Sequence, residues 1–299
     1  MPVLNYATEY QQALDLNFPY VLNFGALYSS PSNALFKWTN AKTIEIPVIS
    51  TSGRKDANRD TIGSLSRNFD NAWETKTLTN QRYWDTLVHP MDIDQTNMAA
   101  SIPNITQVYN EQQKFPEMDA YLISKVYSDW IAKGKTANTD ALTTANILTV
   151  FDTMMKNMTN ARVPKKGRIL YVIPDINTLL KNADKINRQV MVDGMAGDAG
   201  VINRAVNSLD DVEIVEVPSD LMMTVYNFTS GWTAGTGAKQ INMCLIHPLA
   251  VITPHTYTFA ALDEPTAKTQ GKYYYYEESF EDAFVLDNKV NAIDFNIIV

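Results

Sequence analysis

Three histidines and a single cysteine are the side chains of this sequence that bind transition metals most readily. They are His89, His247, His255 and Cys244, and none of them lies in a CxxC, HExxH or His-x-His pattern. A zinc site built from one chain uses such short spacings to bring its ligands together. The spacing therefore favours histidines with structural roles, and we expect no metal site.

A run of glycines, Gly194, Gly197 and Gly200, has the spacing of a loop that could hold a phosphate group. A phosphate-binding loop follows a strand, opens a helix and usually continues into Lys-Ser or Lys-Thr. Here the preceding segment is polar and no such dipeptide follows. The run predicts an ordinary loop, and we expect no cofactor.

Carboxylates occur at two places that could carry acid–base chemistry. Asp175 follows an apolar segment, where α/β enzymes often place a catalytic acid, but a helix cap explains it equally well. Glu277, Glu278, Glu281 and Asp282 form a cluster that fits a solvated or intersubunit face better than a pair of acid catalysts. Since no Gly-x-Ser-x-Gly motif is present either, we expect no catalytic residues.

The composition limits the functions that these side chains could serve. Of 299 residues, 45% are hydrophobic and only 19% are charged, which leaves a surface rich in neutral polar groups. Such groups are desolvated more cheaply than ions, so the surface suits contact with other protein. The net charge of −8 argues against a dedicated nucleic-acid binder. We see neither a secretory signal nor an apolar run of membrane-spanning length, and a lone cysteine points to a reducing compartment.

The apolar periodicity predicts an α+β fold. Helices are expected at 105–115 and 117–133, separated by Pro116, at 143–160 with Thr143 or Thr144 as its cap, and at 174–182. Strands are expected at 43–49, 75–88, 168–173, 212–217, 241–246, 250–253, 272–280 and within 284–298, with 241–252 forming a buried strand pair.

A long projection is expected near the N-terminus. The extended runs 43–49 and 75–88 would form its two strands, and a polar loop at 51–63 would form its tip. An isolated hairpin is marginally stable in water, so its partner is either another chain or the body of the protein. Residues 1–40 are irregular and aromatic; they fit either an arm laid over another surface or an N-terminal layer of the same domain.

Four consecutive tyrosines, Tyr273, Tyr274, Tyr275 and Tyr276, lie in one predicted strand. Successive side chains of a strand point to opposite faces, so both faces carry an aromatic pair. One interpretation is that the fold packs against one face and a partner subunit against the other. The alternative is a strand buried on both faces within one subunit.

Four segments together resemble the major capsid (coat) proteins of tailed bacteriophages, in particular a group from phages of Gram-positive bacteria. They are the phrase Pro-Glu-Met-Asp-Ala-Tyr within 116–125, the strand 163–174 that ends in proline, the strand at 212–219, and the strands within 239–251. They occur in the order found in that family, over roughly residues 40 to 299.

The resemblance implies the phage major-capsid fold. Residues 1–40 would be the N-terminal arm and 41–90 the extended β-hairpin loop. Residues 91–139 and 241–299 would form the peripheral domain with a long spine helix, and 140–240 would form the axial domain.

The resemblance also implies a function without catalytic turnover. Copies would assemble into hexamers and pentamers of an icosahedral phage head that encloses double-stranded DNA and is built in the host cytoplasm. A separate scaffolding protein and a portal protein would be partners, DNA would be held by weak non-specific contacts, and no membrane would be involved. The alternatives are an encapsulin-like nanocompartment shell and a soluble α/β enzyme. The residues expected to contact a neighbouring subunit are those of the loop tip, Gly53, Arg54, Lys55, Asp56, Arg59 and Asp60, and those of the tyrosine strand.

Overall fold

The computed structural model describes residues 20–54, 56, 59–60, 67–96, 100–183 and 208–298. As predicted, the fold combines helices and sheets; neighbouring strands of its sheets are antiparallel except β5 and β7, which are parallel. Its helices are α1 (Gly25–Tyr28), α2 (Pro90–Gln95), α3 (Ile102–Tyr109), α4 (Phe115–Ala132), α5 (Ile147–Asn160) and α6 (Pro174–Lys181). Its strands are β1 (Lys37–Asn40), β2 (Thr43–Thr51), β3 (Phe69–Thr77), β4 (Gln81–Val88), β5 (Ile169–Val172), β6 (Ser208–Leu209), β7 (Val212–Glu216), β8 (Tyr226–Asn227), β9 (Thr233–Ala234), β10 (Ile241–Ile246), β11 (Val251–Ile252), β12 (His255–Asp263), β13 (Tyr273–Glu281), β14 (Phe284–Val285) and β15 (Ile293–Ile297).

The main core surrounds a five-stranded sheet in the order β15-β10-β5-β7-β6. Every residue of β5 and β10 is buried, as expected for central strands that are covered on both faces. The expected pairing of 241–246 with 250–253 is wrong, because β10 lies between β5 and β15 whereas β11 pairs with β14. The helix expected at 143–160 starts later than predicted, at Ile147, and follows Asn146 rather than a threonine cap.

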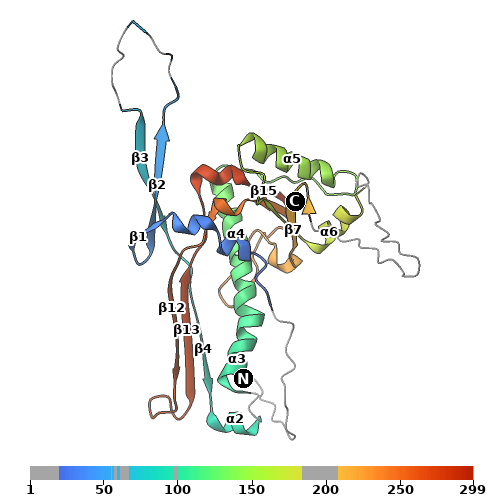
Figure 1. Ribbon diagram of the computed structural model, residues 1–299. Coiled ribbons are helices and arrows are strands. Elements are labelled where there is room, and N and C mark those ends of the chain that lie inside the picture. Colours follow the sequence, from blue (N-terminus) through green and yellow to red (C-terminus); the bar gives the residue numbers. More distant parts are fainter. Residues whose placement is uncertain are drawn as a thin grey trace, which may run out of the picture.

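The helical segments on either side of Pro116, where the sequence predicted a break, are continuous. A π turn (Asn110–Lys114) joins α3 to α4, and Pro116 lies in the first turn of α4. A proline lacks the N–H for the usual helical hydrogen bond and crowds the carbonyl one turn earlier, and a wider turn accommodates both effects. The two predicted helices are thus one rod (Figure 1). Within the described residues, no helix has the length and apolarity needed to cross a membrane.

A three-stranded antiparallel sheet in the order β12-β13-β4 runs alongside this rod (Figure 1). The predicted strand 272–280 is therefore confirmed as β13. The interpretation of 75–88 as one strand of the projection is correct only for 75–77, which end β3; it is wrong for β4, which pairs with β13 along its whole length. The chain leaves the projection at Leu78, whose buried side chain fixes the turn between β3 and β4.

The projection itself is the hairpin of β2 and β3, which extends away from the body (Figure 1). Its base rests on a second, smaller core that includes Ile44, Ile46, Phe280 and Phe284. The second strand was not predicted because Phe69–Thr77 is mostly polar. Its pairing with β2 is continuous from Thr43 opposite Thr77 to Thr51 opposite Phe69.

Of residues 20–40, which the sequence assigned either to an arm laid over another surface or to an N-terminal layer, the first part packs into the main core of its own chain. Phe24 and Leu27 are fully buried in the main core, and the Phe24 ring lies 4.7 Å from the ring of Tyr171 on β5. The N-terminal layer that the sequence left as an alternative is therefore correct for this part. Residues 1–19 of the expected arm lie outside the described residues.

Candidate intersubunit surfaces

The histidines and the cysteine that were first considered as metal ligands make structural contacts within the fold. His89 Nδ1 accepts a hydrogen bond from the Met91 amide at 3.2 Å, and His247 Nδ1 accepts one from the Leu249 amide at 3.3 Å, each at the start of a helical turn. Cys244 is fully buried in β10, and burial raises the pKa of its thiol. Across the part of the chain that the structure describes, no group of three or more His, Cys, Asp or Glu side chains could hold a metal ion.

The remaining candidates for chemistry are Asp175, the glycine run and the four clustered carboxylates. Asp175 is exposed in the first turn of α6, where a carboxylate interacts favourably with the helix N-terminus. The glycine run at 194–200 lies outside the described residues. The four clustered carboxylates are divided between the two faces of the β12-β13-β4 sheet, as the contacts below show.

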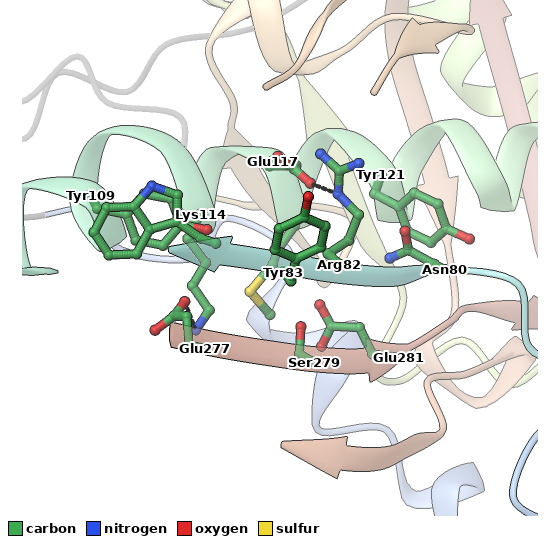
Figure 2. Close-up of a pocket in the computed structure, with 12 residues that line it drawn as sticks. Asn80, Arg82, Tyr83, Tyr109, Lys114, Glu117, Tyr121, Glu277, Ser279 and Glu281 are labelled. Atoms are coloured by element: carbon green, nitrogen blue, oxygen red, sulfur yellow. Dashed lines mark hydrogen bonds and ion pairs between the residues drawn. The ribbon is translucent and has the colours of Figure 1, made fainter. Parts of the chain in front are cut away.

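The inner face of this sheet meets the long helix in a polar seam (Figure 2). Arg82 of β4 donates to Glu117 Oε1 at 2.6 Å, and Lys114 lies 3.0 Å from Glu277 Oε1 of β13. The Trp84 ring stacks on Tyr109 of α3, with 4.0 Å between the ring centroids. These contacts enclose a cavity of only about 30 Å³. Since that is the space of only a few water molecules, the side chains of the seam are closely packed and fix the sheet on the helix.

Three residues of the Pro-Glu-Met-Asp-Ala-Tyr phrase each attach a different segment to α4. Glu117 binds Arg82 of β4, as described above. Asp119 binds the N-terminal layer, and the Tyr121 hydroxyl donates to Asp282 Oδ1 at 2.7 Å, after β13. The phrase that carries the family resemblance is thus the part of α4 that holds three other segments of the chain against this helix.

Asp119 is the most heavily bonded of these three residues. Its side chain is fully buried and accepts hydrogen bonds from the Tyr20 hydroxyl at 2.5 Å, the Asn23 amide nitrogen at 2.8 Å and the Phe24 amide nitrogen at 3.4 Å. Burial raises the pKa of this carboxyl, and the hydrogen bonds lower it in part. The main core at Phe24 is therefore fixed to the helix through one acid.

The outer face of the sheet carries a group of aromatic rings that covers all three strands. The ring centroid of Tyr276 on β13 lies 5.9 Å from that of Tyr83 on β4 and 6.3 Å from that of Phe259 on β12. The centroids of Tyr274 and Tyr276 are 6.5 Å apart, and those of Tyr257 and Phe259 are 6.3 Å apart. Tyr83, Tyr257 and Phe259 are exposed. An exposed aromatic patch of this kind is typical of a protein–protein interface. We call it the aromatic face: Tyr83, Tyr257, Phe259, Tyr274 and Tyr276.

Acidic groups lie among these rings. Tyr276 donates a hydrogen bond to Glu278 Oε2 at 2.8 Å, which raises the pKa of Tyr276 to about 12. The bonds from Gln81 and Tyr276 lower the pKa of Glu278, so this carboxylate is charged at neutral pH. Tyr274 donates to Asp85 at 3.4 Å. The aromatic face is therefore negatively charged as well as apolar.

The structure divides the predicted tyrosine strand between two surroundings. Tyr275 points to the helix, with its ring 5.8 Å from Trp84, whereas Tyr274 and Tyr276 belong to the aromatic face. Because β13 is paired with β12 on one side and β4 on the other, its backbone cannot add a partner strand. Only the side chains of its outer face can reach a neighbour.

The hairpin carries a second exposed apolar surface. Pro47 lies opposite Trp73 and Thr51 opposite Phe69 in the β2–β3 ladder, so these residues share one face with Ile49. Ile49, Phe69 and Trp73 are 68%, 53% and 53% exposed. We call this surface the hairpin face. The pattern of Phe69 and Trp73 at even spacing was the sequence signal for it, and the prediction missed it because the strand was placed too late.

The loop tip that the sequence singled out lies beyond the end of β2. Gly53, Arg54, Asp56, Arg59 and Asp60 are exposed, and Lys55 lies outside the described residues. Arg67, where the chain returns, lies over the Phe69 ring at 5.3 Å. Arg67 therefore covers part of the hairpin face on the side of the tip.

Comparison with known proteins connects these surfaces to a fold. No protein-family model and no curated protein sequence matches the chain. Solved structures do match over nearly its whole length. A chain of the cyanophage P-SCSP1u capsid has a TM-score of 0.72 and 10% identity, covering 98% of this chain and 93% of its own. A chain of the mature capsid of bacteriophage PhiM1 has a TM-score of 0.72 and 15% identity (99% and 92%), and a chain from Mycobacterium phage Che8 has 0.68 and 14% (99% and 98%). The chain therefore has the fold of bacteriophage capsid proteins, and its sequence resemblance to tailed-phage major capsid proteins is confirmed at the level of the fold.

Proposed function

We propose that this chain is the major capsid protein of a tailed bacteriophage and that its copies assemble into hexamers and pentamers of an icosahedral head around double-stranded DNA. The observation that carries the proposal is the match of capsid chains over almost all of both lengths, which leaves no large part of this chain for another activity. The large exposed apolar surfaces of the hairpin and the sheet support it, because a monomer gains nothing from exposing them.

In this proposal, the hairpin holds the shell together. The hairpin face of one copy packs on the aromatic face of the next, so that each buries the other's exposed rings. The exposed Arg54 and Arg59 of the tip can pair with Asp85 and Glu278 beside the aromatic face, whereas Asp56 and Asp60 of the tip need cations elsewhere on the neighbour. Such a contact is heterologous and repeats around a ring, as the closed symmetry of a shell requires.

The remaining parts take the roles that the family resemblance implies. The rod of α3 and α4 is the spine helix of a peripheral domain that includes the β12-β13-β4 sheet. The axial domain at the symmetry axes includes α5, α6 and the five-stranded sheet, to which 241–299 contribute β10 and β15, and the extended loop is the β2–β3 hairpin with its tip. Scaffolding and portal proteins assist assembly, and an acidic inner wall would not bind the genome tightly.

Electron microscopy of the purified full-length chain, alone and co-expressed with its phage's scaffolding protein, tests the proposal directly. We expect closed shells from the co-expressed protein, and native particles should contain DNA. Native particles that contain an enzyme instead would identify an encapsulin-like compartment. A chain that stays monomeric under all of these conditions would overturn the proposal.

A deletion of residues 51–63 tests the role of the hairpin tip. The variant should unfold at about the same temperature as the wild type, because no described residue of the deleted segment belongs to either core. It should fail to form closed particles. Normal particles from the deletion variant would refute the role assigned to the tip.

A further inference from the structure

Strand β12 is an edge of the β12-β13-β4 sheet, and it faces away from the long helix (Figure 1). Its nine residues, His255–Asp263, pair with β13 on one side only. Among the described residues, no backbone hydrogen bond outside this ladder involves residues 255–263. One row of amide and carbonyl groups is therefore available to another strand.

Proteins usually protect such an edge with a charge, a proline or a bulge. In β12 the only irregularity lies at its beginning, between His255 and Tyr257. From Thr256 to Leu262 the strand has neither charge nor proline. Tyr257, Phe259 and Leu262 are exposed along it. A long, uncharged and aromatic edge is what a strand needs in order to pair with a partner.

We propose that β12 pairs in antiparallel register with β12 of a second copy, about a two-fold axis at Phe259. A two-fold axis perpendicular to the sheet keeps the outer faces of both copies on one side, so residues of the aromatic face must oppose each other. Phe259 is the midpoint of the strand, and a register centred there opposes residues 257–261 of the two copies. The bulge before Tyr257, where the Thr256 hydroxyl donates to Ala41 O at 3.2 Å, lies outside this pairing. The register places the large Tyr257 opposite the small Ala261 of the second copy, which relieves crowding.

The charges at the two ends of the strand complement each other in this register. Asp263 is exposed at one end. At the other end, Lys42 lies with its ammonium 5.5 Å from the ring centroid of Phe280, the residue paired with Tyr257. In the proposed register, Asp263 of each copy would lie at the strand end that carries Lys42 of the other copy, so the two opposite charges would attract each other. Within one copy these residues are roughly 20 Å apart along the strand, beyond the range of direct interaction.

This inference rests on the proposed self-assembly but uses a different surface from the hairpin contact. The hairpin would cover the face of the sheet, whereas the second β12 would extend its edge. The hairpin contact closes a ring, and a two-fold contact joins one ring to the next. Such a strand pair is small for a stable interface, so it contributes through its repetition over many copies.

A single cysteine at the axis provides the test. Opposed residues of antiparallel strands have Cα atoms about 4.5–5.5 Å apart, which a disulfide can bridge. The only native cysteine, Cys244, is fully buried. Under mild oxidation, assembled Phe259→Cys should therefore form covalent dimers on a non-reducing gel. The control is Leu262→Cys, at an equally exposed position of the same strand (49% against 44%). Its two cysteines would lie roughly 20 Å apart, so it should give at least tenfold less dimer.

A charge exchange in the Phe259→Cys background tests the register. Asp263→Lys and Lys42→Asp should each lower the dimer yield several-fold, and the double exchange should restore it. Additive losses in the double variant would overturn the register, because only the intermolecular pair predicts rescue. If both cysteine variants formed shells but gave equally low yields of covalent dimer, the edge pairing would be overturned and the proposed function would stand. Dimers of Phe259→Cys would support the edge pairing even if this variant formed no shells, because Phe259 also belongs to the aromatic face, and the proposed function is then judged by whether the wild-type chain forms shells.

Discussion

The two antiparallel sheets that extend from the body differ in what covers their apolar faces. In the β12-β13-β4 sheet, the long helix covers one face through the Trp84–Tyr109 stack and two ion pairs. In the β2–β3 hairpin, the chain covers only the base, at Ile44 and Ile46. The first sheet is therefore stabilised within its own subunit, whereas the distal hairpin can gain the burial of its rings only from another molecule.

Charged side chains strengthen the boundary between the covered and uncovered parts of the hairpin. Lys76 of β3 lies 3.4 Å from Asp287, which also pairs with Lys133 at the end of α4. Burial lowers the pKa of Lys133, as expected where cations gather at partly buried positions. These ion pairs fix the base of the hairpin to the end of α4. Because the direction of the hairpin is already set in the free subunit, binding to a neighbour does not have to offset the entropy of ordering it.

The largest effect should follow from removing the acid that fixes the body to the helix. Asp119→Ala leaves several buried donors without an acceptor, among them the amides of Asn23 and Phe24. We expect it to lower the free energy of unfolding by about 3 kcal/mol. Urea denaturation of the unassembled subunit measures this value. The matched control, Asp175→Ala, removes an exposed acid and should cost less than about 1 kcal/mol. Equal costs would contradict the role of Asp119.

Two tryptophans test the difference between the sheets directly. Trp84→Ala removes the ring stacked on Tyr109 and should lower the free energy of unfolding of the subunit by about 2 kcal/mol. Trp73→Ala removes a ring that is 53% exposed and should change it by less than about 0.5 kcal/mol. Sedimentation should show the reverse order for assembly, with Trp73→Ala the more defective. A subunit destabilised equally by both variants would show that the hairpin is stabilised within its own chain.

The sequence predicted well those elements whose partners lie within the main core. The strands β5 and β10 are continuous apolar runs, and α5 repeats its apolar residues at helical spacing, so burial alone decides their structure. Pro116 was misinterpreted, because local rules predict a break whereas a π turn keeps the rod continuous. That outcome depends on contacts along the whole rod, which local spacing does not contain.

The surfaces were predictable only in part. The loop tip was found because charges and glycine interrupt all periodicity there. The hairpin face was missed because β3 has few apolar residues, and those face away from the body. The aromatic face depends on the register that places Tyr83 and Phe259 beside Tyr276, and register is a long-range property that one strand's sequence does not determine.

The smallest effect is expected from two glutamates on opposite faces of β13, whose contributions to stability depend on pH in opposite ways. Glu281 lines the seam, where burial raises the pKa of its carboxyl. Its favourable contribution to the free energy of unfolding is therefore present at low pH and is lost as pH rises through that raised pKa. Glu278 on the outer face has a lowered pKa, so its contribution to the free energy of unfolding is present at neutral pH and is lost as pH falls.

Glu281→Gln should therefore raise the melting temperature of the subunit at pH 8 and leave it almost unchanged near pH 4. Glu278→Gln should lower it slightly at pH 8, again with little change near pH 4. Thermal unfolding of both variants across this range measures the difference, and shifts of the same sign at pH 8 would contradict the assignment of the two glutamates to a dry inner face and a wet outer one.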